Sequence, residues 1–263
     1  MSRANGFRER GAWVPAMVMW VAAQVGVVVG SCAAKHTTSG PAPNTAQGWF
    51  ELGLERLNRG QYGGAISAFQ RVTLDYASTH YAADAQFYLA KAYADKKDYD
   101  QAITEYEFFM TNYPRSAYFE EASYQIALCY VRRAPRSDLD QADLKTAREL
   151  LELFRERFPE SRLLAGASEL ESEIAGRLAR KEFASAKLYM KAGEFAAARV
   201  YLEHMLDEYP RLSFRDEARL CLAICLENMG EQEKARSSYH ELELTASDER
   251  VRKEAAGRLR LLR

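Results

Sequence analysis

The fold is decided by residues 88–93, YLAKAY, together with residues 98–114, DYDQAITEYEFFMTNYP. In both segments large apolar residues recur three to four positions apart, which is the spacing of a helix with one buried face. Ala90 and Ala102 offer small side chains at which two antiparallel helices can cross closely. Pro114 then closes the second helix, because proline cannot continue a helix. The two segments therefore predict a pair of packed helices.

This helix pair recurs along the chain. The small residue that opens each second helix is found at Ala65, Ala102, Ala147, Ala198 and Ala235. The pattern resembles the tetratricopeptide repeat, and a strict array of that kind repeats every ~34 residues. Here the intervals are 37, 45, 51 and 37 residues, so two repeats carry insertions. We therefore expect an all-α protein, a right-handed α-solenoid of five tetratricopeptide-like helix pairs with a C-terminal capping helix.

The two insertions differ in kind. The first contains residues 132–138, RRAPRSD, where Pro135 excludes a continuous helix and predicts a longer turn. The second, from Leu163 to about Lys191, has no proline and carries apolar residues at helical spacing. It predicts one long helix that acts as a stiff joint between the two parts of the array.

The joint divides the repeats into two groups. The front repeats cover about residues 47–160 and the back repeats about residues 163–263, so the solenoid as a whole covers residues 47–263. Residues 248–263 have a helical pattern with a heavily charged face. Such a face suits a capping helix, because the end of a repeat array needs one polar side.

Three of the second helices end in an aromatic residue followed by proline, at positions 113–114, 158–159 and 209–210. Two of these closures continue with a serine, Ser116 and Ser161. Serine is a favoured N-cap residue, so we expect both side chains to cap the helix that follows.

The N-terminal segment has the pattern of a targeting signal. Three arginines precede residues 12–30, which carry no charge, and the run ends at residues 29–32, VGSC. That ending resembles the bacterial lipobox, in which the cysteine receives lipid. We therefore expect residues 1–31 to be a cleaved lipoprotein signal peptide, Cys32 to be lipidated, and residues 32–46 to be a flexible tether. The apolar run also approaches the ~20 residues that span a bilayer, so an uncleaved membrane anchor is the alternative.

The charge balance excludes a generally basic nucleic-acid-binding protein. The chain has 36 Lys and Arg against 37 Asp and Glu, and its formal net charge is −1. Removal of residues 1–31 takes away three arginines and one glutamate, which leaves a net charge of −3. A protein held at a membrane by lipid needs no electrostatic attraction to anionic headgroups.

No motif in the sequence predicts catalysis. The four histidines are scattered, and no glycine-rich phosphate-binding loop occurs. Cys221 and Cys225 are four residues apart without nearby histidines, so we expect them, together with Cys129, to be small core residues. The sequence therefore indicates a protein that is not an enzyme and that uses no cofactor or metal.

The combination of a lipobox, five degenerate repeats and aromatic–proline closures resembles the BamD family, the lipoprotein subunit of the machine that inserts β-barrels into the Gram-negative outer membrane. The resemblance implies a scaffold whose back repeats hold the BamA periplasmic domains, alongside other assembly-machine subunits. Its front repeats would engage unfolded outer-membrane protein segments. Ala33, which follows the lipidated cysteine where Asp would favour the inner membrane, implies a lipid anchor at the periplasmic face of the outer membrane.

Two further functions stay open at this point. One is a periplasmic tetratricopeptide adaptor for cell-envelope division or peptidoglycan enzymes. The other is an uncleaved, membrane-anchored co-chaperone. An intact Met1 on the mature protein would distinguish the second of these from a lipoprotein.

The candidate peptide-binding residues belong to the first helix of each front repeat, because first helices line the concave face of such solenoids. They are Phe50, Asn58, Phe87, Tyr88, Lys91, Tyr124, Gln125 and Arg132. Aromatic residues beside Lys91 and Arg132 suit an extended peptide with aromatic side chains and a terminal carboxylate. The competing interpretation is that the aromatic residues pack against neighbouring helices and that the cations are merely solvated.

Overall fold

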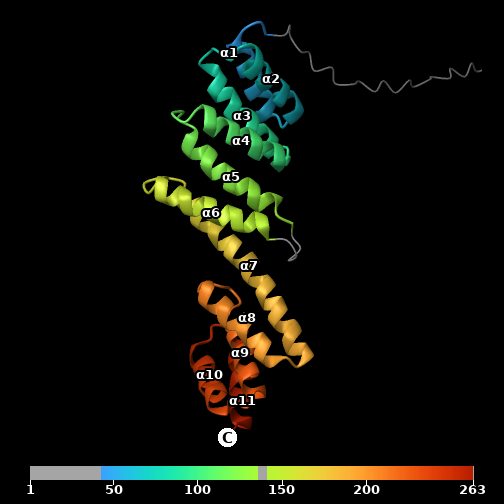
Figure 1. The fold of residues 1–263 in the computed structure, drawn as a ribbon, viewed down its shortest axis with the longest axis vertical. Helices are drawn as coiled ribbons and strands as arrows, with labels where there is room; N and C mark the ends of the chain where they lie inside the picture. Colours follow the sequence, from blue (N-terminus) through green and yellow to red (C-terminus); the bar gives the residue numbers. More distant parts are fainter. Residues whose placement is uncertain (1–42, 136–140, 263) are drawn as a thin grey trace, which may run out of the picture. The chain divides into compact units, whose positions relative to one another are not determined.

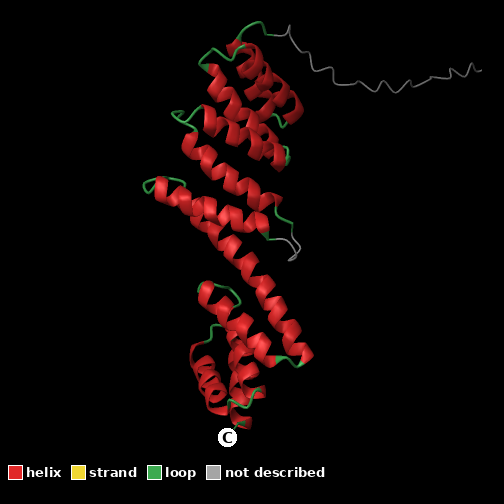
Figure 2. Cartoon of the chain, in the orientation of Figure 1, coloured by secondary structure: helices red, strands yellow, loops and turns green. Residues whose placement is uncertain are grey.

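The computed structural model describes residues 43–135 and 141–262 of the 263-residue chain. The regular secondary structure of these residues is entirely helical, with eleven helices in chain order (Figure 1 and Figure 2). The helices are α1 Ala46–Asn58, α2 Tyr62–Asp75, α3 Tyr81–Asp95, α4 Tyr99–Asn112, α5 Phe119–Arg133, α6 Ala142–Arg157, α7 Leu164–Ala192, α8 Phe195–Glu208, α9 Arg215–Asn228, α10 Gln232–Thr245 and α11 Glu249–Leu261.

Each helix packs mainly against the helix before it and the helix after it. Further contacts join α1 to α3, α5 to α7, α7 to α9 and α9 to α11, so that first helices of adjacent pairs also touch. This order of contacts is that of a solenoid, in which every unit is stabilised by its neighbours. It confirms the predicted all-α array of five helix pairs, α1–α2 to α9–α10, with α11 as the capping helix.

Small residues set the distance between paired helices. The five alanines that open the second helices are all 0% exposed: Ala65, Ala102, Ala147, Ala198 and Ala235. In the first pair the approach is closer still. A Cβ atom added to Gly53 would lie 2.4 Å from Cε1 of Phe69, so only a residue without a side chain fits there.

The long helix predicted between the two groups of repeats is α7, which has 29 residues. It ends at Gly193, whose φ of 83° is a left-handed conformation that glycine adopts without strain. The contact of α7 with α6 is smaller than its contact with α8. One cluster of buried apolar side chains nevertheless continues from α5 through α7 to α9. The joint is therefore part of a shared core.

Ser116 and Ser161 do not cap the helices that follow them. Their Oγ atoms accept hydrogen bonds from the backbone nitrogens of Tyr118, at 3.2 Å, and Leu163, at 2.9 Å. Tyr118 and Leu163 are themselves the N-cap residues of α5 and α7. The expected serine caps are therefore wrong, because the turn after each proline places the serine two residues before the cap.

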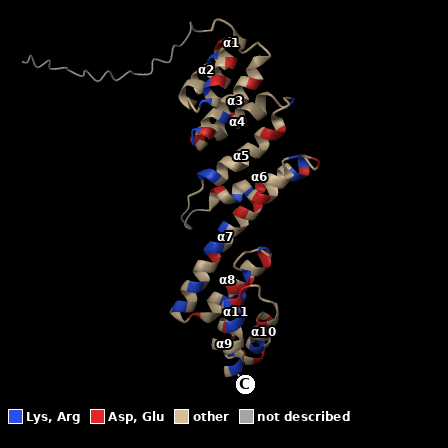
Figure 3. Ribbon diagram, turned by 180° about the vertical axis from the view of Figure 1, so that it is seen from behind, with Lys and Arg blue, Asp and Glu red and all other residues tan. Residues whose placement is uncertain are grey.

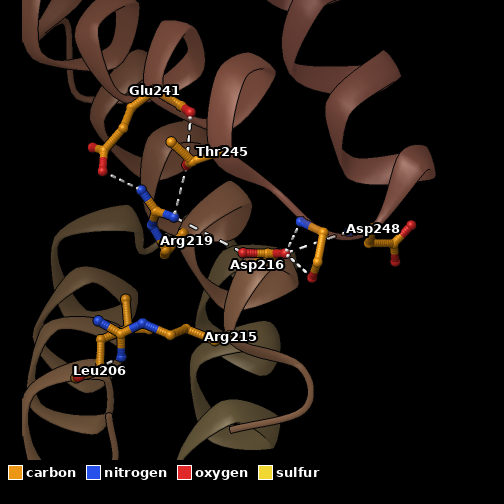
Figure 4. Close-up of polar contacts among 8 residues, drawn as sticks. Leu206, Arg215, Asp216, Arg219, Glu241, Thr245 and Asp248 are labelled. Atoms are coloured by element: carbon orange, nitrogen blue, oxygen red, sulfur yellow. Dashed lines mark hydrogen bonds and ion pairs between the residues drawn. The ribbon is translucent and has the colours of Figure 1, made fainter. Parts of the chain in front are cut away.

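The capping helix α11 is held by a carboxylate from α9. Asp216 accepts hydrogen bonds from the amide and the hydroxyl of Ser247, both at 2.7 Å, in the turn that precedes α11 (Figure 4). Burial would raise the pKa of Asp216, but these hydrogen bonds outweigh it and hold the pKa below its usual value. Arg219, one turn further along α9, pairs with Glu241 of α10 at 2.6 Å. Hydrogen bonds and an ion pair therefore hold α10 and the turn before α11 against α9.

The predictions for the N-terminal segment concern residues that the structure does not describe. Cys32 and the division at residue 31 lie outside the described ranges, so lipidation and cleavage stay predictions. Of the helices formed by residues 43–135 and 141–262, none combines the length and the apolar character that a membrane crossing requires.

Candidate functional site

The eight candidate residues lie on α1, α3 and α5, as predicted, but they separate into two groups. The aromatic members are partly or fully packed against other rings. The polar members of α5, Gln125 and Arg132, line a small hollow between α3, α4 and α5. Next to it, a larger hollow extends to α7.

Phe50 and Tyr88 belong to a cluster of rings that joins α1, α2 and α3. The ring centroid of Phe50 lies 5.9 Å from Phe69, 5.6 Å from Tyr81 and 5.7 Å from Tyr88. Burial, together with a hydrogen bond to Tyr118, raises the pKa of the Tyr88 hydroxyl. Both residues are half-buried, so part of each side chain remains accessible to solvent.

Phe87 is a core residue and is 1% exposed. Its ring stacks on Tyr118 at 4.5 Å and meets the edges of Tyr106 and Phe109, both at 5.7 Å. The prediction that Phe87 contacts a bound peptide is therefore wrong. The physical reason is that neighbouring positions on a helix point about 100° apart, which directs Phe87 into the contact with α4 and α5.

Tyr124 and Asn58 differ in their surroundings. Tyr124 is half-buried, with its ring 6.0 Å from Phe154. Its hydroxyl lies over Gly166, where an added Cβ would come within 3.1 Å. Tyr124 therefore fills the space between α5, α6 and α7. Asn58 is exposed in the last turn of α1.

The polar candidates of α5 lie at a hollow of about 180 Å³. Gln125 and Arg132 line it together with Asp95 and Tyr99. The Nζ atom of Lys91, one turn further back on α3, lies 3.8 Å from the carboxylate of Asp95 but does not line the hollow. The structure thus brings Gln125 and Arg132 together, with Lys91 next to one of the residues that line the hollow.

Below this hollow lie two groups that do not titrate at neutral pH. Cys129 lines its floor, and burial raises the pKa of the thiol to about 12. Burial also raises the pKa of the Tyr106 hydroxyl, which has no hydrogen-bond partner among the described residues. A neutral buried thiol is a packing residue and a poor nucleophile. The hollow therefore offers binding groups and no activated nucleophile.

A larger hollow, of about 530 Å³, shares Tyr99 and Arg132 with the small one. It is lined by three arginines, Arg132 of α5 and Arg177 and Arg180 of α7. A third hollow, of about 270 Å³, continues along α7 and shares Arg177 and Arg180. We call these two larger hollows the arginine groove. Figure 3 shows Lys and Arg at several places along α7.

Arg177 is fixed by the end of α5. Its guanidinium donates hydrogen bonds to the carbonyl oxygens of Val131, Ala134 and Pro135, at 3.0, 3.1 and 2.8 Å. Carbonyls at a helix C-terminus lack partners within the helix and carry partial negative charge, so an arginine suits this place. Arg177 therefore joins α7 to α5 and presents its charge in a fixed position.

Sequence reasoning did not find Arg177 and Arg180. Both lie within the segment predicted as a long helix, for which no binding role was predicted. The signal available was their spacing: Glu173, Arg177 and Arg180 are four and three residues apart, which places them on one face of α7. That this face meets Arg132 depends on the contact between α5 and α7, which no local pattern encodes.

Known proteins are similar to this chain in sequence. A BamD outer membrane protein assembly factor of Neisseria meningitidis serogroup A is 23% identical over 234 residues, which cover 83% of this chain and 87% of that protein. The BamD assembly factor of Caulobacter vibrioides is 25% identical over 187 residues, which cover 71% of this chain and 61% of that protein. A solved structure of the TPR2AB domain of yeast Sti1 in complex with pHSP90 has a TM-score of 0.46 at 16% identity, covering 75% of this chain and 76% of that one.

The profile of the YfiO family, which is described as an outer membrane lipoprotein family, matches residues 43–242. These residues include every helix from α1 to α9 and most of α10. The match covers well over half of the chain. The chain therefore belongs to the YfiO family of outer membrane lipoproteins.

Proposed function

We propose that this protein is a non-catalytic lipoprotein of the outer membrane that serves in the assembly of β-barrel proteins. Its membership of the YfiO family carries the proposal, since curated relatives with coverage above 80% of both chains are outer membrane protein assembly factors. The protein is anchored through lipid on Cys32 at the periplasmic face. It holds the BamA periplasmic domains on its back repeats and works with the other subunits of the assembly machine.

The front repeats engage unfolded barrel segments in this proposal. Two features support it: the partial exposure of Phe50 and Tyr88, and the hollow lined by Gln125 and Arg132, with Lys91 paired to Asp95 at its edge. Aromatic side chains of a bound segment would pack on the rings, and its terminal carboxylate would meet the cations.

Affinity purification from the native envelope tests the assembly role. We expect a BamA-type barrel protein to co-purify at a stoichiometric level. Its absence, together with recovery of division or peptidoglycan enzymes, would favour the periplasmic adaptor instead. Mass spectrometry of the same sample tests the anchor, because an intact Met1 would contradict cleavage before Cys32.

A peptide-binding experiment tests the front site. We expect Lys91→Ala and Arg132→Ala each to weaken binding of a barrel-terminal peptide by about tenfold, the usual effect of removing a charge-assisted hydrogen bond. Arg155→Ala is the matched control, because the Arg155 side chain is 56% exposed and that of Arg132 is 53% exposed. Equal binding by Arg132→Ala and Arg155→Ala would contradict this part of the proposal.

A further inference from the structure

We propose that the arginine groove binds an extended acidic segment of a partner protein. This is a second binding surface, centred on α7, in addition to the aromatic face of α1 and α3. The inference goes beyond the proposed function, because it needs no barrel segment and no BamA as the ligand. It rests on the charge, the fixed geometry and the apolar surfaces of the groove.

The charges of the groove are not balanced from within. Glu173 is the one carboxylate among the described residues that line it, against four arginines, Arg132, Arg177, Arg180 and Arg211. The carboxylate of Glu173 lies 4.0 Å from Arg132 and 3.9 Å from Arg177, which is the outer limit of an ion pair. The groove therefore carries a surplus of positive charge that an anionic ligand would neutralise.

Arg133, the neighbouring arginine of α5, has its charge neutralised by carboxylates of the protein itself. Arg133 lies 2.7 Å from Asp100 and 2.6 Å from Asp143, and these carboxylates raise its pKa further. Among the described residues Arg132, the preceding residue, has only the 4.0 Å contact with Glu173, and 53% of its side chain is exposed. Of these two adjacent arginines, Arg133 therefore joins helices within the fold, whereas Arg132 is available to a ligand.

Part of the groove is preorganised. The three carbonyl oxygens of α5 and its following turn hold the Arg177 guanidinium, so it loses little freedom when a ligand binds. Arg180 lies over the ring of Phe214, with its guanidinium carbon 6.0 Å from the ring centroid. A guanidinium group can form two parallel hydrogen bonds with the two oxygens of a carboxylate. This geometry favours Asp and Glu side chains as ligands of the groove.

The shape and the apolar surfaces of the groove favour an extended peptide over a compact anion. Its two hollows, of about 530 and 270 Å³, exceed the size of a single phosphate or carboxylate. Two partly exposed apolar side chains, Leu212 and Phe214, lie beside the arginines in the second hollow. A segment that carries several Glu or Asp residues together with apolar residues would offer contacts to both kinds of surface.

The mild negative charge of the whole chain makes this basic groove a local feature. The net charge is −1, so the protein as a whole attracts no anions. A general affinity for polyanions is therefore not expected. Binding should need the arginines of the groove in particular, which makes the proposal testable by single residues.

The test uses the full-length protein in detergent and two fluorescein-labelled peptides of ten residues. In the first peptide Glu alternates with Val and Ser, and in the second every Glu is replaced by Gln. By fluorescence anisotropy we expect the Glu peptide to bind at least about tenfold more tightly than the Gln peptide. Equal affinities would overturn the proposal.

Variants locate the binding. Arg180→Gln combined with Arg211→Gln should weaken binding of the Glu peptide about tenfold, whereas Arg155→Gln should leave it within about twofold. Both arginines of the double variant are exposed and Arg177 is kept, since it also fastens α5. Glu173→Gln should strengthen binding, because it removes the one carboxylate of the groove. If the double variant fails to fold, Arg211→Gln alone, in a turn outside the helices, provides the same comparison.

Competing ligands separate the alternatives. Vesicles of phosphatidylglycerol that bind through Arg180 and Arg211, while the Glu peptide does not bind, would overturn the proposal in favour of a lipid-headgroup site. Displacement of the peptide by inorganic phosphate at constant ionic strength would likewise overturn it, in favour of a compact anion site. If the wild-type protein does not bind the Glu peptide while BamA still co-purifies with it, this inference is rejected and the proposed function is kept.

Discussion

The front repeats, α1–α6, and the back repeats, α7–α11, share one architecture but differ in the balance of the contacts that join their helices. In the front repeats, rings pack on rings: Phe87 alone contacts four other aromatic side chains, with centroids 4.5 to 5.7 Å apart. In the back repeats, ion pairs cross between helices, as in Arg199 with Glu231 at 2.8 Å and Arg258 with Glu227 at 3.1 Å.

The difference shows that the helix-pair geometry does not depend on one kind of contact. In both groups a fully buried alanine lies where the two helices of a pair cross. Large side chains of different kinds fill the space around that crossing. Apolar burial is insensitive to salt and to pH, whereas ion pairs and hydrogen-bonded carboxylates are not. We therefore expect the two groups to respond differently to mutation, salt and acid.

The largest expected effect is in the front repeats. Phe87→Ala removes the ring at the centre of the contacts among α3, α4 and α5, and such a change costs about 3–5 kcal/mol of unfolding free energy. Hydrogen exchange should show the loss first in α3 to α5 and least in α10 and α11. Tyr201→Ala is the control, because Tyr201 is 37% exposed and stacks on Tyr189 at the surface. Similar losses for both variants would contradict the central role of Phe87.

The next effect tests the closest helix approach. Gly53→Ala places a Cβ 2.4 Å from the Phe69 ring, so we expect destabilisation of about 1–3 kcal/mol. Gly176→Ala in α7 is the matched control, since nothing lies within 4 Å of its added Cβ. That change should be neutral or stabilising by up to about 1 kcal/mol, because alanine favours the helix. Urea denaturation of the two variants gives the comparison, and an equal shift in both would contradict it.

A smaller effect belongs to the back repeats and depends on pH. Asp216→Asn weakens the hydrogen bonds that hold the turn before α11, and we expect a loss of about 1 kcal/mol at pH 7. The folded pKa of Asp216 lies below its usual value of 3.8. The stabilisation is therefore fully present above about pH 4 and is lost as the pH falls through the folded pKa. The difference between wild type and variant should shrink in acid, measured by urea denaturation from pH 7 to pH 3.

The Phe87→Ala variant is the control for this pH dependence. Its cost comes from lost apolar packing and should not change between pH 7 and pH 3. An Asp216→Asn difference that stays constant through pH 3 would show that the charge of the carboxylate does not contribute.

The smallest effect concerns a single cation of the back repeats. Arg199 bridges Glu203, at 2.7 Å, and Glu231, at 2.8 Å, and its side chain is 28% exposed. Arg199→Gln should cost less than about 1 kcal/mol, and the difference should fall further in 0.5 M salt. Thermal unfolding at low and high salt measures it. A loss that does not depend on salt would indicate a packing role for the Arg199 stem.

The candidate site was predictable in part. Gln125 and Arg132 belong to one hollow because both lie on one face of α5, and helical spacing reveals this directly. Phe87 was misassigned, since the same spacing does not say which of two adjacent aromatic residues faces the next helix pair. Arg177 and Arg180 were missed, because their meeting with Arg132 depends on how α7 packs against α5.

Local sequence patterns were sufficient to predict the helix pairs, their alanine crossings, the long α7 and the capping α11. These features follow from local patterns, in which small residues, apolar spacing and proline act over one or two turns of helix. Only the tertiary structure decided which aromatic side chains are core and which arginines share a groove. That decision rests on the packing angle and register between separate helices, to which every contact across the interface contributes and which no single segment encodes.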